Sequence, residues 1–212
     1  MAADRARAPQ ARTRLARRAV LDAARTLFLE RGYGATTIEA ISNAADVPQA
    51  TVYRLFSSKP GILKGLLDTS IAGDDEPIAV AERPQVQTLL AAPEPTDVLA
   101  RLVAISVDIN TRTAPVYRIL VSAAGSDPEA TALLDDLTRQ RQEGQGRVAA
   151  VLAQSGSLRD GLRAQDAADV IHALASPELY RLLVIDRGWA RDRYARWLVD
   201  SLVAQLLVSM PA

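Results

Sequence analysis

The chain has 212 residues, no net charge and no cysteine, and about half of its residues are hydrophobic. Without cysteine it forms no disulfide and no thiolate metal site, and its one histidine cannot build a zinc centre without several carboxylates. The longest uncharged run, residues 201–212, is shorter than the roughly 20 apolar residues that span a bilayer. Scarce aromatic residues and abundant Ala, Leu, Val and Arg favour helices, so we expect an all-α, cytoplasmic protein without cofactor or membrane partner.

Charge is distributed unevenly along the chain. Residues 1–68 hold 11 Lys or Arg and 6 Asp or Glu, a net charge of +5, whereas residues 69–212 hold 14 and 19, a net charge of −5. A basic segment in an otherwise acidic chain is typical of phosphate binding by that segment alone. We therefore expect the first third of the chain, and not the rest, to contact nucleic acid.

The start of the chain predicts a basic arm followed by a helix. Residues 1–13 carry arginines among alanines without apolar periodicity, which indicates a flexible basic arm, either solvated or lying along a DNA minor groove. Residues 14–31 place their apolar side chains on one stripe, and Gly32 supplies a left-handed residue past the end of this predicted helix. Arg17 and Arg18 lie in its first turns, where they either contact DNA phosphates or are simply solvated.

Residues 36–59 indicate two short helices joined by a tight turn. Thr36 and Glu39 have the spacing of a capping box, which predicts that the first of these helices begins near Thr37. The pattern breaks before Pro48, because proline has no N–H and fits best in a first helical turn. A second helix is therefore predicted to start at that proline or directly after it.

This second helix has one apolar and one polar face. Val52 and Phe56 lie one turn apart and are expected to face the interior. The other side offers an amide, a small residue, hydroxyls and a guanidinium, the groups that read base edges and hold phosphates. These candidate DNA-binding residues are Pro48, Gln49, Ala50, Thr51, Tyr53 and Arg54. We interpret residues 36–59 as a helix-turn-helix whose recognition helix runs over residues 49–55.

A fourth helix completes the predicted DNA-binding domain, residues 14–72. Ser58 is expected to cap it, with Lys59 in its first turn. The amino-terminal end of a helix attracts anions, so Lys59 predicts a phosphate clamp. Thr36 and Thr37 are expected to hold phosphates beside it.

The run from Arg18 to Leu67 resembles the amino-terminal domain of the TetR family of transcriptional regulators. The matching residues are Ala23, Ala24, Leu27, Phe28, Gly32, Tyr33, Thr36, Thr37, Ala44, Ala45, Val47, Thr51, Tyr53, Phe56, Ser58 and Lys59. The resemblance implies a ligand-responsive repressor that binds a palindromic operator as a homodimer and is released by a small hydrophobic effector. Three positions depart from the family pattern, because Asp46 stands for glycine, Pro48 for serine and Leu55 for histidine or tyrosine. Leu55 therefore offers no polar side-chain contact to DNA at this position.

The remainder of the chain predicts a linker region and a second helical domain. Residues 73–96 are acidic and proline-rich, with one short helix over 85–90. Residues 97–212 are predicted to form a ligand-binding and dimerisation domain, in which Asp127 caps a long helix. The five expected helices cover residues 96–110, 115–124, 128–153, 165–187, where Pro177 permits a kink, and 192–208.

The last two predicted helices carry more apolar side chains than one small domain needs. These residues are Val170, Leu174, Leu179, Leu182, Leu183, Leu198, Leu202, Leu206 and Leu207. In TetR-family proteins the final two helices pair with the same helices of a second chain, and residues 176–183 resemble the penultimate helix of one subgroup. Such a homodimer holds two recognition helices about 34 Å apart, as a two-fold operator requires. A purely intramolecular core is the alternative.

No sequence motif indicates an enzyme, because glycine-rich phosphate loops, nucleophile elbows and zinc-protease motifs are all missing from the sequence. The resemblance implies an effector site in the second domain. Its candidate residues are Val103, Val107, Tyr117, Leu120, Leu137, His172 and Tyr180. The polar members, His172 above all, are equally compatible with satisfied core positions. Two other functions remain open, namely a DNA-binding helical protein that acts architecturally or through a protein partner, and a helical binding module that no longer reads DNA.

Overall fold

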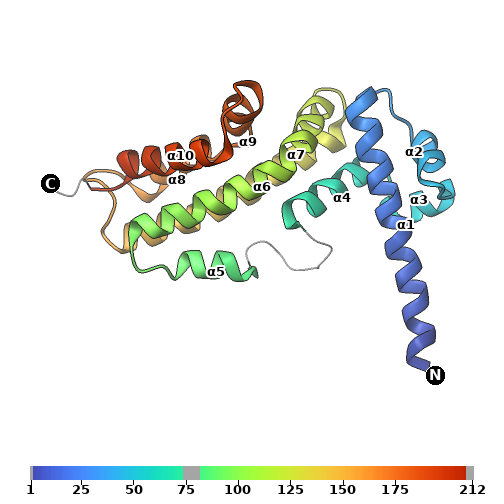
Figure 1. The fold of residues 1–212 in the computed structure, drawn as a ribbon, viewed down its shortest axis with the longest axis horizontal. Helices are drawn as coiled ribbons and strands as arrows, with labels where there is room; N and C mark the ends of the chain where they lie inside the picture. Colours follow the sequence, from blue (N-terminus) through green and yellow to red (C-terminus); the bar gives the residue numbers. More distant parts are fainter. Residues whose placement is uncertain (1, 74–81, 209–212) are drawn as a thin grey trace. The chain divides into compact units, whose positions relative to one another are not determined.

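The structure, a computed structural model, describes residues 2–73 and 82–208 and is helical almost throughout (Figure 1). Within these residues it contains no strand, only an isolated bridge between Leu158 and Leu207. The all-α prediction is confirmed. The acidic run predicted at residues 74–76 lies outside the described residues.

The chain divides into two compact units, one of residues 1–69 with 115–134 and one of residues 70–114 with 135–212. Residues 115–134, which the sequence assigned to the second domain, therefore belong with the first unit. The helices of the amino-terminal part are α1 (Ala2–Arg31), α2 (Ile38–Ala45), α3 (Gln49–Phe56) and α4 (Lys59–Ala72). Their shared core is apolar and includes Val20, Ala24, Phe28, Ile41, Val52, Phe56, Ile62, Leu63 and Leu66.

The first helix is longer than the sequence predicted. Helix α1 runs from Ala2 to Arg31, whereas the sequence predicted a basic arm over residues 1–13 before a helix from residue 14. Alanine and arginine are among the strongest helix formers, and they dominate this segment despite Pro9. The left-handed end of α1 at Gly32, with φ of 82°, agrees with the prediction.

The start of α2 differs from the predicted capping box. The side chain of Thr37, and not that of Thr36, accepts the cap hydrogen bond, from the N–H of Ala40 at 3.1 Å. The Thr36 hydroxyl instead donates to the carbonyls of Gly32 and Leu27. Thr36 is buried and Thr37 is exposed, so Thr37 is the residue free to cap α2. The three-residue spacing from Thr36 to Glu39 did not reveal this difference.

The tight turn between α2 and α3 is made by Asp46 in the left-handed conformation, with φ of 51° and ψ of 42°. Aspartate tolerates this conformation better than most residues with a Cβ. The buried Ser42 hydroxyl donates to the Val47 carbonyl at 2.6 Å and closes the turn. The departure from glycine at position 46 therefore preserves the helix-turn-helix geometry.

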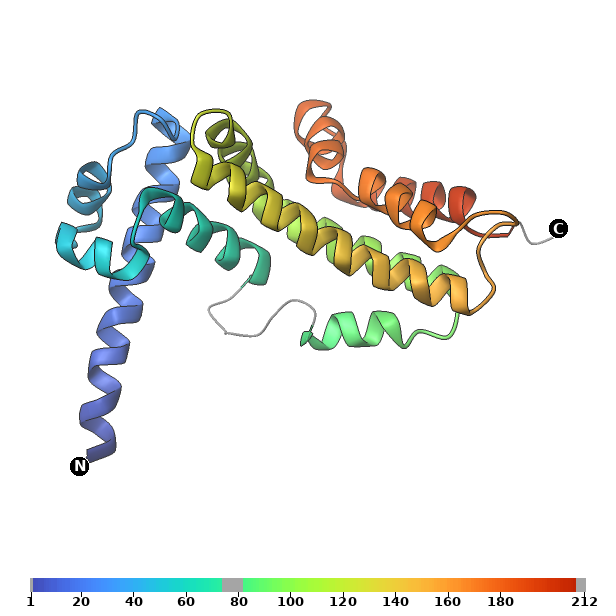
Figure 2. The ribbon, with the colours of Figure 1, turned by 180° about the vertical axis from the view of Figure 1, so that it is seen from behind.

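The second part of the chain contains α5 (Pro84–Leu90), α6 (Pro95–Ala124), α7 (Pro128–Gln154), α8 (Ala164–Leu174), α9 (Pro177–Tyr180), the π-helix η2 (Arg181–Asp186) and α10 (Arg191–Leu206) (Figure 2). Aromatic packing supports the core of the second unit, where Tyr180 meets Tyr194 edge to face with ring centroids 5.3 Å apart. The Thr111 hydroxyl lies 2.8 Å from the Tyr180 hydroxyl.

Two helices predicted separately over 96–110 and 115–124 form the single helix α6, with Pro115 inside it. Proline interrupts a helix because it lacks an N–H and crowds the preceding turn. Here the residues on either side of the proline, Ala114 and Val116, are buried, and their packing outweighs the local break. The break predicted near Pro177 does occur, between α8 and α9.

The tail leucines are mostly intramolecular core. Leu198, Leu202, Leu206 and Leu207 are each at most 7% exposed and pack within the second unit, so the prediction that they supply a dimer surface is wrong. The end of α10 is held to the α7–α8 loop, where the N–H of Arg159 donates to the Leu206 carbonyl at 2.9 Å. None of the described helices combines the length and the apolar character needed to cross a bilayer.

We predict that Asp46→Gly raises the free energy of unfolding by roughly 0.5–1 kcal/mol, because glycine adopts the left-handed conformation without the Cβ strain. Chemical denaturation measures this change. The matched control is Ala132→Gly on the exposed side of α7, where the same new residue should lower the free energy of unfolding by about 1 kcal/mol. Destabilisation by both substitutions would contradict the account of the turn.

Candidate nucleic-acid interface

Helix α3 presents its predicted DNA-reading face to solvent. Val52 is fully buried and Phe56 nearly so, whereas Tyr53 on the opposite side is 51% exposed. Gln49 and Arg54 are exposed beside it. The other predicted contacts on α3 and its cap are Pro48 and Ala50, both exposed, and Thr51, which is half-buried. We call Thr37, Gln49, Ala50, Tyr53 and Arg54 the reading surface.

Two predicted phosphate contacts have a different role in the structure. Thr36 is 1% exposed and its hydroxyl is bonded inside the domain, so it cannot hold a phosphate. The ammonium of Lys59 donates to the carbonyls of Tyr33 and Thr36 at 3.0 and 3.1 Å and lies 4.2 Å from the centre of the Tyr33 ring. A lysine has three N–H donors, and two of them are used within the protein. Lys59 therefore ties the start of α4 to the α1–α2 loop.

The two arginines predicted on α1 differ in their surroundings. The guanidinium of Arg17 lies over the Phe56 ring, 4.8 Å from its centre, so Arg17 packs against α3. Arg18 is exposed and lies 3.9 Å from the equally exposed Asp22. A pair this open to solvent contributes little to stability, so Arg18 remains available to a phosphate.

A second set of contacts joins the helix-turn-helix to the first turn of α7. The Tyr33 hydroxyl donates to the Asp127 carboxylate at 2.8 Å, and the Ser58 hydroxyl donates to the Glu129 carboxylate at 3.0 Å. Asp127 also accepts hydrogen bonds from the N–H groups of Glu129 and Ala130, as the predicted cap of α7. The two hydroxyl–carboxylate bonds link segments far apart in sequence, and no local pattern could reveal them.

The contacts between Tyr33 and Asp127 determine which of the two groups is charged at neutral pH. The hydrogen bond from Tyr33 lowers the pKa of Asp127, and the N–H groups of the α7 cap and the positive charge of Lys59 act in the same direction. Burial raises the pKa of the Tyr33 hydroxyl well above its usual range, and the neighbouring carboxylates raise it further. Asp127 is therefore the charged acceptor and Tyr33 the neutral donor at neutral pH.

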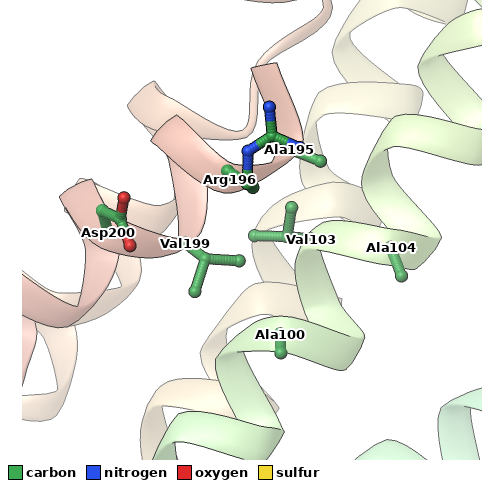
Figure 3. A pocket seen from close by; sticks show the side chains of 7 residues that line it. All are labelled: Ala100, Val103, Ala104, Ala195, Arg196, Val199 and Asp200. Atoms are coloured by element: carbon green, nitrogen blue, oxygen red, sulfur yellow. The ribbon is translucent and has the colours of Figure 1, made fainter. Parts of the chain in front are cut away.

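The candidate effector residues are divided between the two units. Tyr117 and Leu120 are buried in the first unit, whereas Val103, Val107, Leu137, His172 and Tyr180 belong to the second. One hollow in the second unit lies between α6 and α10 and has a volume of about 300 Å³ (Figure 3). Of the predicted residues, Val103 alone lines it. The other lining residues are Ala100, Ala104, Ala195, Arg196, Val199 and Asp200.

His172 is half-buried and has a hydrogen-bonding partner within the second unit. Its Nδ1 lies 2.7 Å from the side-chain oxygen of the buried Gln145. Burial lowers the pKa of His172, the charge of Arg141 lowers it further, and Glu178 and Asp169 oppose this shift. Among the described residues, no group of three or more His, Asp or Glu side chains is arranged to hold a metal ion.

We predict that His172 makes the protein less stable as the pH falls from about 7 to about 5. The folded state holds the imidazole neutral, whereas the unfolded chain takes up a proton near pH 6.5, so acid favours unfolding. Because the chain has a single histidine, His172→Gln should flatten this part of the profile. Chemical denaturation across this pH range measures it, and equal slopes for the two proteins would contradict the assignment.

Comparison with known proteins places the reading surface in a recognised domain. Residues 20–66 match the family described as "Bacterial regulatory proteins, tetR family". The chain is 44% identical over 48 residues to YvkB of Bacillus subtilis (strain 168), an uncharacterized HTH-type transcriptional regulator. That match covers 23% of this chain and 25% of YvkB.

Two solved structures share the fold over nearly the whole chain. The SmeT–triclosan complex has a TM-score of 0.71 at 21% identity, covering 91% of this chain and 92% of SmeT. NalD, the secondary repressor of the MexAB-OprM multidrug efflux pump in Pseudomonas aeruginosa, has a TM-score of 0.69 at 22% identity, covering 92% and 98%. These similarities extend the match from the helix-turn-helix to the helical second half of the chain. The proteins of this family are transcriptional regulators and not enzymes.

Proposed function

We propose that the chain, whose residues 20–66 match the tetR family of bacterial regulatory proteins, is a ligand-responsive repressor that binds a palindromic operator as a homodimer. The observation that carries the proposal is the exposed face of α3. Gln49, Tyr53 and Arg54 present hydrogen-bonding groups to solvent, while Val52 and Phe56 anchor the helix. This is the geometry with which a recognition helix enters the major groove.

The contacts proposed for DNA fall into two groups. Gln49 and Arg54 carry side chains that form paired hydrogen bonds with base edges, and Ala50 permits close approach of the helix to the groove. Thr37 at the start of α2 and Arg18 on α1 are exposed and suit phosphates, which fix the position of the protein on the duplex. Lys59 and Thr36 stabilise the domain in this proposal and do not contact the duplex.

Two chains are proposed to associate through their carboxy-terminal helices. The buried tail leucines are not available for this contact, but Leu182 and Ile185 on η2 are 45% and 53% exposed. Val170 and Leu174 on α8 are half-buried beside the same core. Burial of these apolar side chains against a second copy of the chain would stabilise the dimer.

A small hydrophobic molecule is proposed as the effector. SmeT is a relative in fold whose structure was solved with triclosan. An effector releases DNA only to the extent that it binds the DNA-free form more tightly than the DNA-bound form. The hollow between α6 and α10 is lined mainly by alanine and valine side chains, with Arg196 and Asp200 among its lining residues.

We predict that Arg54→Ala weakens binding to the duplex upstream of its own gene by about 1–3 kcal/mol and relaxes the preference for one base pair, as loss of a base contact does. Arg18→Ala should instead weaken binding to all sequences alike and reduce the salt slope by about 1. Gel-shift titrations at several salt concentrations measure both effects. Arg101→Ala on α6 is the matched control and should change neither. Unchanged binding by both test variants would contradict the assigned interface.

We predict that replacing both Leu182 and Ile185 by aspartate converts the protein to a monomer at micromolar concentration, because four carboxylates would be brought together in the interface. Sedimentation velocity measures the change. Val121→Asp, at a residue 45% exposed on α6, is the matched control and should remain dimeric. A dimer in the double variant, or a monomeric wild type, would refute this interface.

A further inference from the structure

The first turn of α7 is joined to both loops that frame the reading surface. Tyr33, bonded to Asp127, lies in the loop that leads into α2. Ser58, bonded to Glu129, lies between α3 and α4. One turn of one helix therefore contacts the chain just before α2 and just after α3, the two helices that carry the reading surface.

The two loops are also bound to each other. Lys59 donates to the carbonyls of Tyr33 and Thr36, so the loop before α2 and the start of α4 share a cation. The N–H of Thr36 donates to the Tyr33 carbonyl at 3.3 Å, and the next residue is Thr37, the cap of α2. A shift of Tyr33 is thus passed to the start of α2 through the hydrogen bonds to its carbonyl and one peptide unit.

We infer that Asp127 and Glu129 are positioning residues for DNA recognition, which hold the loops before α2 and α4 where the reading surface fits a duplex. This inference rests on the proposed function. Neither carboxylate contacts DNA in this arrangement, and their negative charge would be repelled by phosphates. Their effect passes through Tyr33 and Ser58 alone.

The contacts are suited to positioning more than to stability. Glu129 is exposed and Asp127 only half-buried, and hydrogen bonds this open to solvent contribute little to the free energy of folding. A binding surface, however, must be held to within about 0.5 Å of its productive geometry. Loss of these contacts is therefore expected to change DNA affinity more than it changes folding.

The test uses Tyr33→Phe, Asp127→Asn and the double variant in the full-length protein. Asparagine caps a helix about as well as aspartate, so Asp127→Asn keeps the α7 cap while removing the charged acceptor. We expect each single variant to bind the upstream duplex three- to tenfold more weakly with an unchanged salt slope. The double variant should be no weaker than Tyr33→Phe alone, because the hydroxyl that position 127 binds is already missing in that variant.

A distance measurement separates positioning from loss of structure. The chain has no native cysteine, so spin labels can be placed at Asn43→Cys on α2 and Ala132→Cys on α7, both exposed and both in the first unit, with unlabelled chain in excess. The distribution of distances between the labels should broaden in Tyr33→Phe and in Asp127→Asn. Tyr194→Phe, which removes a hydroxyl bonded to the Leu174 carbonyl in the second unit, should leave affinity and distances unchanged.

The outcomes separate this inference from the proposed function. Weaker binding with a broadened distribution and an unchanged melting temperature supports it. Unchanged affinity and distances, or weaker binding that only parallels a lower melting temperature with an unchanged distribution, overturns it. If the wild type binds no duplex, the proposed function fails, and an unchanged distance distribution in the variants would then still refute the positioning role.

Discussion

Burial of Val52 and Phe56 decides which side of α3 is exposed to solvent, and DNA recognition by this helix depends on that orientation. These two side chains, one helical turn apart, fix the rotation of an eight-residue helix about its axis. With this rotation fixed, Gln49, Tyr53 and Arg54 face the solvent. A short helix has little stability of its own, so its orientation comes from this packing and from the turn at Asp46.

Around this helix the domain uses its polar groups for internal contacts. Lys59 and Thr36 belong to residue types that often hold phosphates, but here they satisfy backbone carbonyls between α1 and α4. A buried or half-buried polar group needs such partners, because leaving it without a hydrogen bond is costly. These internal contacts hold the domain together behind the reading surface, which stays exposed to solvent.

The sequence revealed the features that depend on neighbours along the chain. Apolar spacing identified α2, α3 and the inward position of Val52, and the caps at Ser58 and Asp127 followed from residue type and place. The sequence did not reveal contacts between residues that are far apart along the chain. Tyr33 and Asp127 lie 94 residues apart, and nothing local distinguishes either from a solvated residue. For the same reason the sequence predicted a helix break at Pro115, although packing keeps α6 continuous there. It also predicted that the leucines of the last helix form a dimer interface, whereas the structure buries them in the core of the second unit.

Selection of duplexes from a randomised library, compared between the wild type and Gln49→Ala, tests most directly whether the outward face of α3 reads sequence. The account predicts that the wild type enriches an inverted repeat whose half-sites are separated by one helical turn or a multiple of it. Gln49→Ala should then lose preference at one base pair in each half-site and keep the others. No enriched sequence, or an identical one from both proteins, would contradict the account.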